Sequence, residues 1–409
     1  MCDIVKSDTF PLLTSATAAR ACRMAATIGE RLLARLDDLP RGRGLAGDSG
    51  FALMFSSLAK MTDETSYWEA THRCMRQAAH ADDVPSIGLV EGISGLRAVA
   101  ALLDKERPEY RRLIDQCDTY VESELPDPET VTLCSFQDFD IISGWSGARL
   151  ARCVTAPSPD DKLVDLLIWL LGDDTRWYLV HPALPDRPPE NDIGVAHGIA
   201  GVMATLALTA DMSDDLHRTF LRGQALKLIS YSLREGGRVL WPSSTQGTLK
   251  VDQRGWCYGT PGTAAALLWT GRALSDDAIT AFALDALEAE GSQPVEAWNF
   301  WDRALCHGAL GCALIYASVG HASRCQALGR FVEPLVQLSL DDLEANEMAH
   351  LGVRPDTREH VLLSQLDGSA GMAMALLTLA DQIPADWVRL HGLVPWKRQG
   401  ACQPAGRIG

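Results

Sequence analysis

Two glycine-containing turns carry side chains of the types that bind zinc. The segment RGWCYGTPG contains Cys257, and the segment ALCHGALG contains the adjacent residues Cys306 and His307. Two cysteine thiolates and one imidazole, with a fourth position open, form a standard catalytic zinc site. Each turn precedes a run typical of a helix, and the positive end of a helix dipole stabilises a thiolate. The alternative is that the cysteines are small buried apolar residues and that His307 is structural.

Further candidate residues stand beside similar turns. His197 comes directly before the glycine pair of AHGIAG, and Asp140 lies four residues before the first glycine of DIISGWSG. If all these turns meet at one end of the fold, both side chains lie near the metal and can transfer protons. A hydrogen-bonded core histidine and a solvated or helix-capping aspartate are the alternatives. On the same condition, Trp145, Trp256 and Tyr258 form an aromatic wall for a peptide substrate.

These turns belong to a repeated pattern, Gly-x-x-Gly followed by small and apolar residues. The pairs are Gly47/Gly50, Gly92/Gly95, Gly144/Gly147, Gly198/Gly201, Gly259/Gly262, Gly308/Gly311 and Gly368/Gly371. Their first glycines are 45, 52, 54, 61, 49 and 60 residues apart. Glycine allows a sharp turn into a helix and a close approach of two backbones. Quasi-regular recurrence of this kind indicates repeated supersecondary units. Cys257 and the Cys306–His307 pair occupy equivalent places in successive repeats, which favours the zinc site.

The elements between the glycine turns are amphipathic. Residues 16–36 and 217–236 have apolar side chains at helical spacing and charged side chains on the other face. Each repeat therefore predicts one outer and one inner helix, and the fold class is all-α. We expect a single domain, 1–409, that forms an α,α-toroid (a double-layered α/α barrel) of seven helical hairpins. The segments 107–143 and 172–195 break the pattern, so we expect long loops or a small insert there.

The composition excludes several kinds of partner. The chain has 37 basic and 53 acidic residues and a formal charge of -16, which argues against binding to nucleic acid or anionic membranes. The uncharged stretch 193–210 contains a histidine and glycines, so we expect no transmembrane segment. The N-terminus lacks the pattern of a signal peptide, and 11 cysteines are unevenly spaced. We therefore expect reduced thiols and a cytoplasmic location.

Taken in order, AHGIAG, WCYGTPG and CHGALG, together with the seven glycine turns, resemble the LanC family of lanthipeptide (lantibiotic) cyclases, which includes the cyclase of the nisin class. The resemblance covers nearly the whole chain. It implies a toroid of seven inner and seven outer helices. It also implies Zn²⁺ bound by Cys257, Cys306 and His307, with His197 and Asp140 as the acid/base residues.

One position departs from the family pattern. Members commonly have an arginine four residues before the cysteine of WCYG, where this chain has Gln253, and Arg254 follows one place later. In a regular element, adjacent side chains point in different directions. The departure leaves the role of Arg254 open.

The resemblance also implies a reaction and its partners. A dehydratase converts Ser or Thr of a precursor peptide, which carries a leader, to dehydroalanine or dehydrobutyrine. The cyclase then adds a peptide Cys thiol to that alkene by Michael addition and closes a lanthionine or methyllanthionine ring. An exporter is a further expected partner, within a membrane-associated synthetase complex to which the cyclase binds peripherally.

Two other functions compete with cyclisation. A prenyltransferase-like toroid also activates a peptide thiol on zinc, but its ligand set is Asp, Cys and His, whereas this chain offers two Cys and one His. A LanC-like protein without cyclase activity would bind peptides or glutathione and would form no rings.

Overall fold

The computed structural model describes residues 10–81, 85–105, 107–177, 191–245, 253–298, 300, 302–345 and 363–397. The chain divides into two compact units. The first unit comprises Met1–Asp82, Val295–Val388 and Val394–Gly409, and the second comprises Asp83–Pro294 and Arg389–Leu393. Over the described ranges, no helix combines the length and the apolar character needed to cross a bilayer.

Every predicted glycine turn begins a helix. The first glycine of each pair is the N-cap of α2 (Asp48–Thr62), α4 (Ile93–Asp104), α7 (Trp145–Arg152), α9 (Ile199–Thr209), α11 (Thr260–Leu274), α13 (Ala309–Ser323) and α16 (Ser369–Leu379). Most residues of these helices are buried, including an unbroken run in α13 from its first residue to His321. They are the predicted inner helices.

The second glycine of a pair is required by a close approach within the turn. A Cβ atom at Gly201 would lie 2.1 Å from the carbonyl oxygen of Val195, and one at Gly371 would lie 1.7 Å from that of Gln365. A side chain at either place would push the turn away from the helix that follows it. Gly259 has a different reason to be glycine, since its φ of 94° is in the left-handed region.

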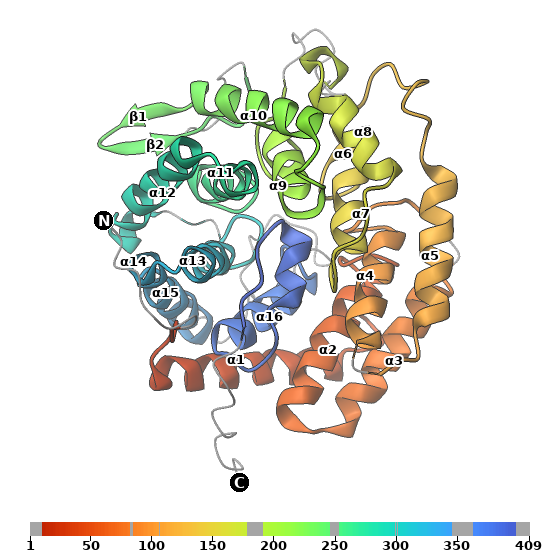
Figure 1. The fold of residues 1–409 in the computed structure, drawn as a ribbon. Coiled ribbons are helices and arrows are strands. Elements are labelled where there is room, and N and C mark those ends of the chain that lie inside the picture. The colour runs from red at the N-terminus through yellow and green to blue at the C-terminus, as the bar shows by residue number, and fades with distance from the viewer. Residues whose placement is uncertain are drawn as a thin grey trace, which may run out of the picture. The chain divides into compact units, whose positions relative to one another are not determined.

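Amphipathic helices alternate with the inner ones along the chain. They are α1 (Ser15–Ala34), α3 (Thr65–Ala79), α5 (Arg111–Glu124), α8 (Lys162–Leu171), α10 (Asp215–Ser230), α12 (Asp277–Gly291) and α15 (Val332–Ala345). Each of those from α3 onward packs on the inner helix that precedes it. Because α1 packs on α16 within the first unit, the N-terminal helix takes the outer place beside the last inner helix (Figure 1).

The structure differs from the sequence prediction in two segments, 107–143 and 217–236. The segment 107–143, expected to be loop or insert, contains α5 and the single turn α6 (Phe136–Phe139). Of the segment 172–195, η1 (Asp174–Arg176) is a short 3₁₀ turn, and residues 178–190 lie outside the described ranges. The expected helical segment 217–236 ends at Ser230, where the chain enters a hairpin.

That hairpin is formed by β1 (Leu233–Glu235) and β2 (Arg238–Leu240), which pair antiparallel. Its two-residue loop is Gly236–Gly237, with φ of 57° and 81°. Two successive residues with positive φ are the geometry of a type I′ turn, which fits the twist of a hairpin. The two glycines therefore explain why the polypeptide reverses here and does not continue as helix.

Candidate metal and proton-transfer site

Successive glycine turns of the second unit are joined by backbone hydrogen bonds. The bonds run from Leu89 N to Ile142 O (3.0 Å), from Ile141 N to Ala196 O (3.2 Å) and from Val195 N to Cys257 O (2.8 Å). They follow the order in which α4, α7, α9 and α11 pack side by side. Within this unit the turns therefore share one end of the helices, as the repeat pattern predicted, and their side chains are neighbours.

Asp140 and His197 are in direct contact in this row of turns. Asp140 Oδ2 lies 2.6 Å from His197 Nδ1. Its other carboxylate oxygen, Oδ1, accepts hydrogen bonds from the backbone N–H of Ser143 (2.6 Å) and Gly144 (3.1 Å). The Asp140 side chain is fully buried, whereas that of His197 is 34% exposed. The turn before α7 thus fixes the carboxylate, and the carboxylate fixes the imidazole.

The surroundings favour a proton on this pair. Burial raises the pKa of Asp140, although its hydrogen bond to His197 acts in the opposite direction. Burial alone would lower the pKa of His197, but the hydrogen bond and charge of Asp140, together with the charges of Asp192 and Cys257, outweigh it and raise that pKa. Because Asp140 holds Nδ1, the ring nitrogen that can deliver a proton is Nε2.

A second buried carboxylate, Asp192, lies in the turn before α9 and was missed from the sequence. The hydroxyl of Tyr258 donates to its Oδ2 (2.5 Å), and the backbone N–H of Gly194 donates to its Oδ1 (2.7 Å). Burial raises the pKa of Asp192 to about 6, although both hydrogen bonds oppose this shift. A Cβ at Gly194 would lie 2.5 Å from the Tyr258 ring. The glycine and the carboxylate together fix the direction of the tyrosine.

The predicted aromatic wall is only partly present. Trp145 and Trp256 are 3% and 2% exposed, and the indole N–H of Trp256 donates to a backbone carbonyl (2.7 Å). Side chains so deeply buried offer almost no surface to a substrate, so both tryptophans pack beneath the turns. Tyr258 is partly exposed. Phe136 of α6, which the sequence did not single out, meets the His197 ring edge-on at 5.1 Å between centroids.

Arg254 has a structural partner. Its Nε lies 2.5 Å from Oε1 of Glu290, a fully buried residue of α12, and Arg238 of β2 binds the other oxygen of the same carboxylate at 2.8 Å. The arginine therefore ties the turn before α11 to the outer helix α12. Through this contact Arg254 helps to position the turn that carries Cys257.

In the first unit, Cys306 and His307 lie in the turn before α13. The backbone N–H of Cys306 donates to the carbonyl of Leu366 (3.2 Å), which joins this turn to the one before α16. His307 lies between two carboxylates: its Nε2 is 2.8 Å from Asp302 Oδ2, and its Nδ1 is 3.7 Å from Asp367 Oδ1. Its side chain is 34% exposed, so the ring is held by protein groups and still open to solvent.

The predicted metal ligands are Cys257 in the second unit and Cys306 and His307 in the first. Two thiols and one imidazole match the zinc ligand set predicted from the sequence. Cys257 is 8% exposed, and the other two are partly exposed.

Comparison with known proteins adds the family context. A model of the lanthionine synthetase C-like protein family matches residues 44–391. Nisin biosynthesis protein NisC of Lactococcus lactis subsp. lactis is 23% identical over 252 residues, which are 54% of this chain. The match spans 60% of the length of that relative.

A solved structure, nisin cyclase, superposes with a TM-score of 0.70 at 17% identity, over 90% of this chain and 96% of that one. This likeness shows the fold, an all-α helical toroid, and confirms the fold class predicted from the glycine repeats.

Proposed function

The chain belongs to the lanthionine synthetase C-like protein family, and from this premise we propose that it is a zinc-dependent lanthipeptide cyclase that forms thioether rings in a dehydrated precursor peptide. The observation that carries the proposal is the Asp140–His197 pair, joined at 2.6 Å in the row of turns that includes Cys257. A buried carboxylate that holds a partly exposed imidazole is a suitable proton donor, and ring formation needs one.

The proposed reaction needs no external oxidant or reductant. The sulfur of a peptide Cys adds to the β-carbon of dehydroalanine or dehydrobutyrine, so one C–S bond forms and the C=C π bond breaks. The electron pair moves to the α-carbon and its carbonyl as an enolate. A proton then adds to the α-carbon, and the thiol proton is lost. The product is an isomer of the substrate.

We assign Cys257, Cys306 and His307 as the residues that would hold zinc. Their donor atoms suit the ion, and the imidazole of His307 is already held by a carboxylate at Nε2 (2.8 Å), as is usual for zinc-binding histidines. When bound, zinc would lower the pKa of a substrate thiol that occupies its open position.

The protein's own groups then control the proton. In this proposal His197 donates from Nε2 to the α-carbon of the enolate, because its Nδ1 is engaged by Asp140. Asp140 is fully buried and holds the ring in one orientation, and its charge favours the imidazolium form before transfer. Asp192 fixes Tyr258 on the neighbouring turn, and Phe136 covers one edge of the imidazole.

The test is incubation of the purified chain with a dehydrated precursor peptide, followed by thiol counting and mass measurement. We expect free thiols to be lost with no change in peptide mass. A prenyltransferase-like activity would increase the mass, and a protein that only binds peptides or glutathione would leave the thiols intact. The variant Cys257→Ala should lose both zinc and ring formation, whereas full activity of that variant without metal would contradict the assignment.

The chemistry also defines the partners that we propose. Dehydroamino acids must be formed before the thiol can add, so a dehydratase acts on the leader-bearing precursor before this chain does. We further propose that the chain works in the cytoplasm and that it meets the dehydratase and an exporter in a membrane-associated complex. Co-purification of the tagged chain with a dehydratase from its own host would support this arrangement.

A further inference from the structure

Asp302, the carboxylate that contacts the proposed zinc ligand His307, lies in the turn before α13 and takes no part in the proposed proton transfer. It lies six residues before Gly308 in the sequence, and its side chain is 10% exposed. Its Oδ1 accepts a hydrogen bond from the backbone N–H of Ala304 (2.9 Å), and its Oδ2 lies 2.8 Å from His307 Nε2. One oxygen therefore shapes the turn, and the other holds the imidazole.

The turn before α9 contains the same arrangement. Asp192 lies six residues before Gly198, its Oδ1 accepts from a backbone N–H two residues later (2.7 Å), and its Oδ2 accepts from the Tyr258 hydroxyl (2.5 Å). A Cβ at Gly198 would lie 2.4 Å from Asp192 Oδ1, and one at Gly308 would lie 2.4 Å from Oδ1 of Asp302. Both glycines thus keep room for a carboxylate that directs a side chain of the site.

We propose that Asp302 is a positioning residue for the metal ligand His307. The hydrogen bond from Nε2–H to Asp302 selects the tautomer in which Nδ1 carries the lone pair, so Nδ1 is the atom presented to the metal. Carboxylates in this position also make an imidazole a stronger ligand and fix the direction of the ring. This inference rests on the proposed zinc site.

Asp367 provides an internal contrast. It lies near the opposite nitrogen of the same ring, but its oxygen is 3.7 Å from Nδ1. That separation is beyond a hydrogen bond, so Asp367 adds negative charge near the ring without fixing its tautomer. The two aspartates therefore separate the effect of a hydrogen bond from the effect of local charge.

The experiment compares the unmutated chain with its Asp302→Asn and Asp367→Asn variants. Asparagine at 302 keeps an oxygen that can accept from the Ala304 N–H, so the turn is retained, but it presents an amide in place of the carboxylate to Nε2. Zinc affinity is measured by competition with a chelator at fixed pH. We expect Asp302→Asn to weaken zinc binding about 10–100-fold and Asp367→Asn to weaken it far less.

A spectroscopic measurement on the unmutated chain makes the test independent of how well a variant folds. In the zinc-loaded, unmutated protein, His307 should show a slowly exchanging ring N–H resonance from Nε2, and its absence would overturn the role of Asp302. Equal affinity of Asp302→Asn and the unmutated chain, or an equal loss in both variants, would overturn the role of Asp302. If the unmutated chain itself binds no zinc, the proposed function fails at its metal site, and this inference fails with it.

Discussion

Buried charged side chains lie at both ends of α7, but the two sets differ in how many of their hydrogen-bonding groups are paired. At its N-terminal end the fully buried Asp140 holds His197, whose ring is 34% exposed. Near its C-terminal end Arg149 is fully buried. A guanidinium has five N–H donors, and those of Arg149 make five hydrogen bonds: to Ser158 O, Pro159 O, Asp161 Oδ2, Thr209 O and Thr209 Oγ1.

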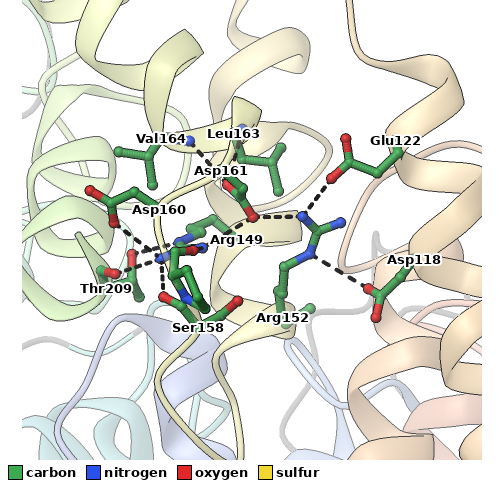
Figure 2. Close-up of polar contacts among 12 residues, drawn as sticks. Asp118, Glu122, Arg149, Arg152, Ser158, Asp160, Asp161, Leu163, Val164 and Thr209 are labelled. Atoms are coloured by element: carbon green, nitrogen blue, oxygen red, sulfur yellow. Dashed lines mark hydrogen bonds and ion pairs between the residues drawn. The ribbon is translucent and has the colours of Figure 1, made fainter. Parts of the chain in front are cut away.

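Figure 2 shows how far this second cluster extends. Asp161 also accepts from Arg152 (2.6 Å) and caps α8 through the backbone N–H of Leu163 and Val164. Arg152 in turn binds Glu122 of α5 (2.7 Å). The cluster therefore joins α5, α7 and the start of α8 to the end of α9.

The contrast distinguishes a structural set of charges from a chemical one. All five N–H donors of Arg149 are used in hydrogen bonds within the fold, so this side chain stabilises the structure and has no donor left for a substrate. His197 titrates, has one nitrogen engaged and is open to solvent. Under the proposed function, a buried carboxylate that holds a partly exposed, titratable imidazole is what we expect at the reactive end of α7.

The largest expected effect is at His197. In the variant His197→Asn, the amide can still donate to Asp140, so the fold and the zinc content should be retained. Ring formation should slow about 100- to 10,000-fold, because general acid catalysis commonly contributes that much. The measurement is the initial rate of thiol loss on a dehydrated peptide. An unchanged rate would remove His197 from the proposed reaction.

At the other end of α7, Arg149→Met should reduce stability and leave the chemistry intact. Removing one partner of a buried ion pair costs about 3–5 kcal/mol, because the remaining charges and carbonyls lose their partners. Urea unfolding measures the loss, and the rate per folded molecule should stay near that of the unmutated chain. Arg152→Met is the matched control: Arg152 is itself 11% exposed, and its partners Asp118 and Glu122 are 31% and 47% exposed, so its loss of stability should be smaller. A larger loss of stability for Arg152→Met than for Arg149→Met would contradict the view that Arg149 is the main structural charge at this end of α7.

A smaller effect should appear as a pH dependence of stability at the reactive end. The pKa of Asp192 is raised to about 6 by burial, against 3.8 as its ordinary value. Between these values the folded chain binds more protons than the unfolded chain, so the contribution of Asp192 to the free energy of unfolding falls as pH rises.

Asp192→Asn resembles the protonated acid in shape and cannot titrate. Urea unfolding of both metal-free proteins at about pH 4 and pH 7 measures the difference between them. We expect the free energy of unfolding of the unmutated chain, relative to that of Asp192→Asn, to be lower at the higher pH. A constant difference would show that Asp192 ionises at its ordinary pKa, and a difference that moves in the opposite direction would show a lowered pKa; either result contradicts the prediction.

The inner helices could be predicted from the sequence because their glycines answer a local requirement. At Gly201, for example, the carbonyl six residues earlier leaves no room for a Cβ. In contrast, α5 was missed because only Ile114, Cys117 and Val121 of its residues are buried. Such a thin apolar stripe in a polar segment has the composition of a loop.

For the site, sequence was most reliable inside the repeated motif. Asp140 and His197 stand next to glycine turns, and they do meet. The orientation of a side chain is a tertiary property, which is why Trp145 and Trp256 were expected to face a substrate and are instead buried. Asp192 and Asp302 were overlooked, although both lie six residues before a first glycine. That shared spacing was a usable signal, but the groups that the carboxylates bind depend on the folded turns.

The most direct test of cyclisation is to run the reaction in D₂O with a dehydrated precursor peptide, then return the product to H₂O and locate the deuterium that remains. Addition of the thiol followed by protonation of the enolate predicts one carbon-bound deuterium at the α-carbon for every thiol lost. Thiols that stay free, or thiols lost without deuterium at carbon, would contradict the proposed function.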